Sequence, residues 1–190
     1  MRRRQLLHMI GAQGTRLAKI AEDLLIASRL DRDELRLDSD PVDLGEVVQA
    51  AVQTMREYLP ESISLTASAG SNGAAALGDR SRIEQVLVNL IDNAIKYSPG
   101  GGEVLVSTAV SEGAVRVEVS DRGIGIPPSE QSSVFEKFYR GSLREAQATA
   151  GTGLGLYICR ELVQRMGGTI GVRSEPGAGS TFFFELPRAG

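Results

Sequence analysis

The chain has 190 residues, enough for one domain with a short appendage or for two small units. Its formal net charge of −3, with acidic and basic residues interspersed, argues against a nucleic-acid-binding protein, which carries a basic patch. The single cysteine, Cys159, excludes an intrachain disulfide and a multi-cysteine metal site. No apolar run reaches membrane-spanning length and no secretory signal is recognised, so we expect a cytoplasmic segment without membrane contact.

The first 37 residues are expected to form one long amphipathic helix. Its apolar positions recur in steps of four and three, interrupted once at Gln13, a spacing typical of a helical-bundle seam. These positions are Leu6, Ile10, Leu17, Ile20, Leu24 and Ala27. The helix could pack on its own domain or form half of a bundle that needs a partner. Its length, with no preceding segment to form a hairpin, slightly favours the partner.

The middle of the chain alternates between helices and paired strands. Residues 38–45, with Pro41 among acidic residues, are expected to be a linker, and Asp43 is placed to cap a helix over 44–58. A second helix is expected from Arg80 to Tyr97, a short one over 129–141, and another after the glycine-rich stretch 151–155, ending at 167–168. Strands are expected near 62–70, 74–78, 103–110, 114–121, 169–176 and 180–187.

This order of elements indicates the fold class. Strands outnumber helices and arrive largely in consecutive pairs, whereas a doubly wound parallel sheet needs regular alternation. We therefore expect an α/β (α+β) two-layer sandwich, with a mixed, mostly antiparallel sheet and helices on one face, preceded by one long helix.

Three stretches have residue patterns suited to binding a ligand. In "NLIDNAIKYSP", Asn89 and Asn93 share one helix face, and burying amides among apolar residues is costly unless a partner satisfies them. In "VEVSDRGIGIP", a strand delivers Asp121 at its end, and a carboxylate there can accept a hydrogen bond from an exocyclic amine. In "GTGLGLYI", glycines lead into a helix N-terminus, which suits a phosphate. Each stretch alone has an ordinary alternative: solvent-facing amides, a capping aspartate, or a plain turn.

Taken in order, with "FEKFYRG" between the second and the third, these stretches resemble the nucleotide-binding domain of sensor histidine kinases, where they are the N, G1, F and G2 boxes. The resemblance covers about residues 43–187. It implies the Bergerat fold shared with DNA gyrase and a heat-shock chaperone. It also divides the chain into the second helix of the dimerisation and phosphotransfer bundle (1–37), a linker (38–45) and a catalytic ATP-binding domain (46–190).

The resemblance implies that the ligand is ATP with Mg²⁺ and assigns roles to single residues. Asn93 would ligate Mg²⁺ with Asn89 supporting the site, Lys96 would reach a phosphate, and Tyr97 would reach the base or ribose. Asp121 would recognise the adenine amine, and Arg140, after Phe135 and Phe138, would steady the γ-phosphate. The remaining cofactor-binding candidates are Gly123, Gly125, Ile126, Phe138, Gly151, Thr152, Gly153, Leu154 and Gly155, and residues 141–150 would be a mobile lid.

Two absences shape the expected activity. ATP-hydrolysing members of the superfamily have a glutamate where Asn89 stands, so we expect poor hydrolysis. The family's phosphorylated histidine lies in a stretch such as His-Glu-Leu-Arg-Thr-Pro, whereas His8 is followed by "MIGAQ" and is expected to be an ordinary surface residue. The chain is therefore expected to bind Mg-ATP without phosphorylating itself. The parent protein, which could carry a membrane anchor elsewhere, would be a homodimer that passes the phosphoryl group from a histidine to an aspartate on a response regulator receiver domain.

Two other functions remain open at this point. A serine kinase of the anti-sigma type shares the ATP-binding fold and lacks the histidine helix, but the bundle-like first helix and its linker argue against it. A degenerate nucleotide domain could serve as a docking or dimerisation module, but the intact set of Asn89, Asn93, Asp121 and Arg140 argues against decay.

Overall fold

The computed structural model describes residues 2–68, 74–142 and 151–190, with the side chains of residues 2–12, 15 and 16 outside the described set. The chain divides into two compact units, Met1–Arg36 and Leu37–Gly190. Within the described residues, no helix combines the length and the apolar character needed to cross a membrane.

The first unit consists mainly of helix α1, Arg2–Asp31. The prediction that this helix reaches residue 37 was wrong, because Asp33 adopts a left-handed φ of 57°. The amides of Asp33 and Glu34 then return to the carbonyls of Leu30 and Arg29, the pattern of a Schellman C-cap, which usually has glycine at the left-handed position. Leu17, a member of the predicted stripe, is 66% exposed. The side chains of Leu6, His8 and Ile10 lie outside the described set.

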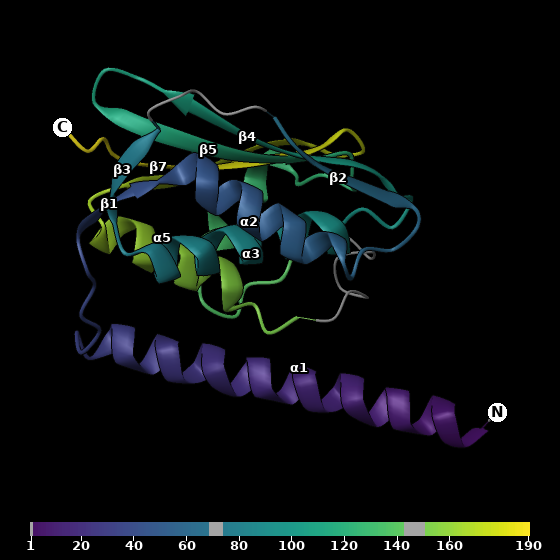
Figure 1. Cartoon of the computed structure of the whole chain (residues 1–190). Helices are drawn as coiled ribbons and strands as arrows, with labels where there is room; N and C mark the ends of the chain where they lie inside the picture. The colour runs from purple at the N-terminus through teal and green to yellow at the C-terminus, as the bar shows by residue number, and fades with distance from the viewer. Residues whose placement is uncertain (1, 69–73, 143–150) are drawn as a thin grey trace. The chain divides into compact units, whose positions relative to one another are not determined.

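The second unit is built on a five-stranded sheet of order β2-β4-β5-β7-β6. Its strands are β2 (Ile63–Ala67), β4 (Gly102–Val110), β5 (Ala114–Asp121), β6 (Thr169–Glu175) and β7 (Gly179–Pro187). β2 pairs with β4 in parallel, and the other three pairs are antiparallel. Three helices, α2 (Leu44–Arg56), α3 (Arg80–Lys96) and α5 (Gly155–Arg165), cover one face of this sheet (Figure 1). The predicted two-layer sandwich with a mostly antiparallel sheet is confirmed.

The core lies between this sheet and the helices. On β5 every second side chain faces the helices, so Val115, Val117 and Val119 are almost completely buried. They meet an apolar stripe of α3, and Ile158, Cys159 and Leu162 of α5 close the layer, together with β7. The buried side chains of β7 are Phe182, Phe184 and Leu186. This packing fixes the C-terminal ends of α3 and β5, which bear the Asn and Asp motifs.

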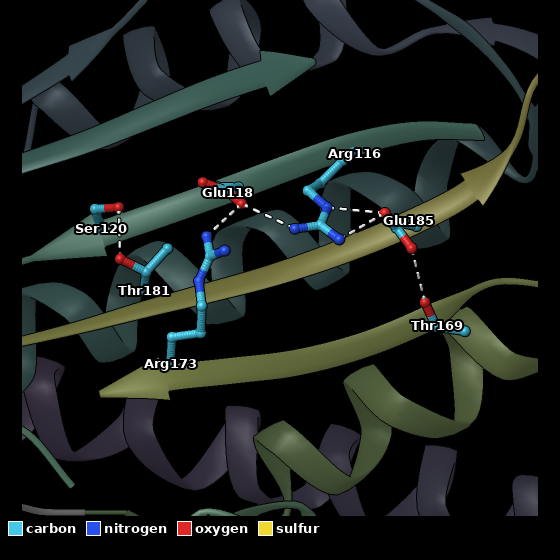
Figure 2. Close-up of polar contacts among 7 residues, drawn as sticks. All are labelled: Arg116, Glu118, Ser120, Thr169, Arg173, Thr181 and Glu185. Carbon is cyan, nitrogen blue, oxygen red and sulfur yellow. Dashed lines mark hydrogen bonds and ion pairs between the residues drawn. The ribbon is translucent and has the colours of Figure 1, made fainter. Parts of the chain in front are cut away.

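On the face of the sheet opposite α2, α3 and α5, polar side chains of β5, β6 and β7 contact one another across the strands (Figure 2). Arg116 on β5 bonds Glu185 on β7 (Nε to Oε1, 2.8 Å), and Arg173 on β6 bonds Glu118 on β5 (Nη2 to Oε1, 2.6 Å). Both guanidinium groups lie over the ring of Phe183. These cross-strand pairs explain why alternate residues of β5 and β7 are polar although the strands are central in the sheet.

The structure differs from the predicted elements in two other places. Asp40–Asp43, within the predicted linker, forms strand β1, which pairs antiparallel with β3 (Ala75–Gly78). The predicted helix over 129–141 is replaced by two 3₁₀ turns, η1 (Pro128–Glu130) and η2 (Ser133–Phe135). A helix cannot continue beyond η2, because Phe138 adopts a φ of 61° and its amide donates to the carbonyl of Gly153 at 2.9 Å.

Candidate functional site

A pocket that is partly open to solvent lies where the C-terminal ends of α3 and β5 meet the segment after β5. The lining residues are Asn93, Tyr97, Asp121, Ile124, Gly125, Ile126, Pro127, Glu130, Val134, Tyr139, Gly141, Leu156, Ser180 and Phe182. An apolar lining with a few polar groups suits a flat ring that must be oriented by hydrogen bonds.

Asp121 is the polar anchor of this pocket. It is the last residue of β5 and continues the buried row of valines, so its side chain is only 9% exposed. Its Oδ1 accepts the N–H of Gly123 at 2.8 Å and the N–H of Ser180 at 3.2 Å. Within the described parts of the chain, Oδ2 has no hydrogen-bond partner. One carboxylate oxygen is therefore fixed by the protein, and the other is available to a ligand.

The electrostatics of Asp121 favour a hydrogen-bond donor as ligand. Burial raises the pKa of its carboxyl group, and the N–H donors of Gly123 and Ser180 oppose that rise. A neutral amine that donates to Oδ2 would stabilise the charged form in the same way as these two backbone groups. The pocket thus has a defined acceptor for one N–H of a ligand.

Gly123 and Gly125 allow close contacts between backbone segments. A Cβ on Gly123 would lie 2.1 Å from the carbonyl oxygen of Tyr97. Gly125 has a φ of +69°, and a Cβ there would lie 2.0 Å from the carbonyl oxygen of Glu175. Side chains at these positions would push the loop away from α3 and β6, so both glycines have a packing reason in addition to any contact with a ligand.

The Asn motif lies on the part of α3 next to the pocket. Asn93 and Tyr97 line the pocket, whereas Asn89 is buried one turn earlier, at 6% exposure. The Oδ1 of Asn89 lies 3.8 Å from where a Cβ on Gly155 would stand, so this amide packs against the first residue of α5. Lys96 does not line the pocket, and its Nζ pairs with Oδ2 of Asp92 at 2.6 Å.

Arg140 lies outside the pocket lining but close enough to act on it electrostatically. Burial raises the pKa of the Tyr97 phenol, and the positive charge of Arg140 counteracts this. Its neighbours Tyr139 and Gly141 both line the pocket. Phe138, a predicted cofactor-binding residue, is 63% exposed and is not part of the lining.

The glycine motif leads into the N-terminus of α5 without lining the pocket. Thr152 Oγ1 accepts the N–H of Leu154 at 3.2 Å, and Leu154 is almost completely buried. In the described structure no side chain caps α5, so its first amides remain available to a ligand. From α5 itself, Leu156 contributes to the pocket. Of the predicted lid, residues 143–150 lie outside the described residues.

Sequence reasoning missed several of the lining residues. Glu130 and Val134 come from the segment between the G1 and F motifs. Tyr139 lies within the F motif and could have been suspected because it precedes Arg140. Ser180 contributes its backbone N–H to Asp121, and any residue except proline could supply that donor. No sequence signal therefore marks this position.

Family comparison gives an independent description of the same region. The family model described as histidine kinase-, DNA gyrase B-, and HSP90-like ATPase matches residues 78–190. Sensor-like histidine kinase SenX3 of Mycolicibacterium smegmatis is 39% identical over 177 residues, covering 93% of this chain and 46% of that protein. Sensor histidine kinase RppB of Synechocystis is 34% identical over 183 residues, covering 96% and 40%. The chain thus spans less than half the length of these relatives.

Solved structures agree with this comparison. Full-length ShkA in complex with AMPPNP superposes with a TM-score of 0.81 at 32% identity, covering 93% of this chain and 37% of that one. The catalytic domain of histidine kinase ThkA superposes with a TM-score of 0.69 at 29% identity, covering 80% of this chain and 98% of that one.

Proposed function

This chain belongs to the family of histidine kinase-, DNA gyrase B- and HSP90-like ATPases, and on that premise we propose that its pocket binds Mg-ATP as the catalytic part of a sensor histidine kinase. The parent protein transfers the γ-phosphoryl group to a histidine on a bundle helix and then to an aspartate of a response regulator. The relatives named above are sensor kinases, which favours this function over the serine-kinase and docking-module alternatives.

The single observation that carries the proposal is the carboxylate of Asp121. Its Oδ1 is held by the backbone N–H groups of Gly123 and Ser180, and its Oδ2 is left for a donor inside a mainly apolar pocket. The 6-amino group of adenine is such a donor on a flat apolar ring. Tyr97 and Ile126 line the same pocket and offer contact surface for the base or the ribose.

The phosphates are proposed to extend from the base toward the N-terminus of α5 and Arg140. Uncapped amides at a helix N-terminus attract anions, and the glycines of the loop leave the backbone accessible. Arg140 already acts electrostatically on Tyr97 at the pocket. Lys96 could reach a phosphate only after leaving Asp92, with which it pairs now. Phosphoryl transfer needs mainly positioning and charge neutralisation, which these groups provide.

The residues at the pocket are compatible with Mg²⁺ but not with a metal held mainly by the protein. Among the described residues, no three His, Cys, Asp or Glu side chains are gathered to hold a metal. Mg²⁺ commonly takes few protein ligands and completes its shell with phosphates and water. We assign the protein ligand to the side-chain oxygen of Asn93, which lines the pocket, with the buried Asn89 beside it. Bound Mg²⁺ would neutralise charge on the phosphates during transfer.

The neutral side chain of Asn89 favours transfer of the phosphoryl group to a histidine over its hydrolysis by water. The Asn89 carboxamide is neutral and cannot take a proton from an attacking water, so ATP hydrolysis should be slow. Transfer then depends on a histidine that another helix presents, with a homodimer of the parent supplying the bundle. Within residues 1–37, helix α1 (Arg2–Asp31) is proposed to be the second helix of that bundle, with 38–45, which contain strand β1, as the linker and 46–190 as the catalytic domain.

Calorimetric titration tests the proposal. ATP with Mg²⁺ should bind, GTP should bind much more weakly, and Asp121→Asn should abolish the preference while circular dichroism confirms its fold. At a hundredfold excess over Kd, binding should add about 2.7 kcal/mol of stability. A separately supplied acceptor hairpin should then become phosphorylated on histidine. If the folded chain does not bind ATP, the proposal is wrong.

A further inference from the structure

Glu130, at the end of η1, has a role that the motif analysis does not assign. Its carboxylate is shared by two residues of the segment around Arg140. The backbone N–H of Ser142 donates to Oε2 at 3.1 Å, and the Ser142 hydroxyl donates to Oε1. The Tyr139 hydroxyl also hydrogen-bonds to this carboxylate. One carboxylate thus holds the chain immediately before and shortly after Arg140.

Glu130 can act as a fixed support because the residue after it is anchored to the sheet side of the pocket. The side-chain amide of Gln131 donates to the carbonyl of Ile126 at 3.2 Å and to the carbonyl of Ser174 on β6 at 2.8 Å. The Ser174 hydroxyl in turn accepts the N–H of Ile126 at 2.8 Å. The position of η1 is therefore set by β6, the edge strand of the sheet.

The other end of the segment is fixed as well. The amide of Phe138 donates to the carbonyl of Gly153 at 2.9 Å, which ties the segment to the loop before α5. Residues 139–142 therefore run between an anchor at Gly153 and an anchor at Glu130. Arg140 lies within this short span, and its charge acts on Tyr97 across the pocket.

We propose that Glu130 is a positioning residue that fixes the backbone of residues 139–142, so that Arg140 is directed at the terminal phosphate of bound ATP. This inference rests on the proposed function, in which Arg140 steadies that phosphate. Glu130 itself touches the substrate phosphates in no step. Its effect should therefore depend on the γ-phosphate more than on the base.

The experiment compares the Kd of ATP with the Kd of ADP, both with Mg²⁺, for the wild-type chain and for Glu130→Gln and Ser142→Ala. Glu130→Gln should weaken ATP binding by about five- to tenfold, the scale of a partly exposed charge-assisted hydrogen bond, and should weaken ADP binding by less than about twofold. Ser142→Ala should act in the same direction by a smaller factor. Because Ser142→Ala changes no charge, a loss in that variant comes from the position of Arg140 and not from the removal of a negative charge near the phosphates.

Two controls make the result specific. Glu112→Gln makes the same charge change in the exposed turn between β4 and β5 and should leave both Kd values unchanged. The double variant Glu130→Gln/Ser142→Ala should bind ATP no more weakly than Glu130→Gln alone, because both changes break the same contact.

Two outcomes would overturn the inference. If the ratio of the ADP Kd to the ATP Kd is unchanged in Glu130→Gln, Glu130 does not act on the γ-phosphate, and if both Kd values rise equally, Glu130 only shapes the pocket wall. Additive losses in the double variant would show that Glu130 and Ser142 act separately. A wild-type chain that binds no ATP would instead refute the proposed function, and with it the premise of the inference.

Discussion

Gly123→Ala tests how closely the loop after β5 must approach α3. A Cβ at this position would lie 2.1 Å from the carbonyl oxygen of Tyr97 and 2.8 Å from Oδ1 of Asp121. Both contacts are shorter than non-bonded atoms allow, and the first involves backbone that cannot rotate away. The loop has to move, and Asp121 and Tyr97 both line the pocket.

The cost can be worked out from the hydrogen bonds at risk. The N–H of Ile124 donates to the Tyr97 carbonyl at 3.0 Å, and the N–H of Gly123 donates to Asp121 at 2.8 Å. Leaving a buried donor or acceptor unsatisfied costs about 1–3 kcal/mol. We therefore expect Gly123→Ala to lower the free energy of unfolding by about 2–3 kcal/mol, and Tm by about 5–10 °C for a chain of this length.

Urea denaturation measures the free energy of unfolding, and Gly100→Ala is the matched control. Among the described residues, no atom beyond the chain neighbours lies within 4 Å of a Cβ built on Gly100, which follows α3 in the turn to β4. That variant should stay within about 0.5 kcal/mol of wild type, as surface substitutions usually do. If Gly123→Ala loses no more stability than Gly100→Ala, the argument from close backbone approach is refuted.

Three further substitutions test the fold and the pocket wall. Asp79→Ala should lower the free energy of unfolding by about 1–2 kcal/mol, because the Asp79 carboxylate caps α3 through the amides of residues 81 and 82, and loss of no more than 0.3 kcal/mol would contradict this. Phe184→Ala should cost about 3–5 kcal/mol in urea denaturation, since the ring is completely buried, and a cost near 1 kcal/mol would mean that this core is loose. Burial and the Glu130 hydrogen bond raise the pKa of Tyr139 to about 12. The contribution of the protonated Tyr139 hydroxyl to the free energy of unfolding is therefore present below pH 10 and lost as pH rises toward 12. The stability difference between wild type and Tyr139→Phe should therefore be constant below pH 10 and shrink above it, and a difference that grows there would contradict the sign.

The parts of the fold that sequence patterns predicted are those set by local periodicity. The apolar stripe of α3 and the alternation along β5 fix which side chains face the core. The sequence predicted that Asp121 ends a strand, and the structure shows that it also continues the row of buried valines on β5. Asp43 also caps α2 as predicted, with Oδ1 accepting the N–H of Gly45 at 2.8 Å.

The parts that could not be predicted depend on residues far apart in the chain. Strand β1 forms because Val42 pairs with Ala76 on β3, and no sequence pattern near Val42 indicates that partner. The segment 129–141 has helical composition, but Phe138 is held in a left-handed conformation by its contact with Gly153. The end of α1 was missed because an aspartate, Asp33, occupies the C-cap position where glycine is the usual signal.

The candidate site shows the same division between local and distant signals. The Asn, Asp and glycine motifs could be recognised in the sequence because each needs a particular residue type at a particular spacing. Two other contributions could not be recognised in the sequence. The N–H that Ser180 donates to Asp121 is a backbone group on the last strand, and the Glu130 carboxylate that binds Ser142 lies outside every motif.

The most direct test of the central claim is a calorimetric comparison of ATP with inosine triphosphate on the unmodified chain. The two nucleotides share the same phosphates and ribose, but inosine has a carbonyl oxygen where adenine has its 6-amino group. If Asp121 Oδ2 accepts from that amine, inosine triphosphate should bind about 100-fold more weakly, because a charge-assisted hydrogen bond is lost and two oxygens face each other. Equal affinity for the two nucleotides would show that Asp121 does not read the base, and the assignment of this pocket to adenine would be wrong.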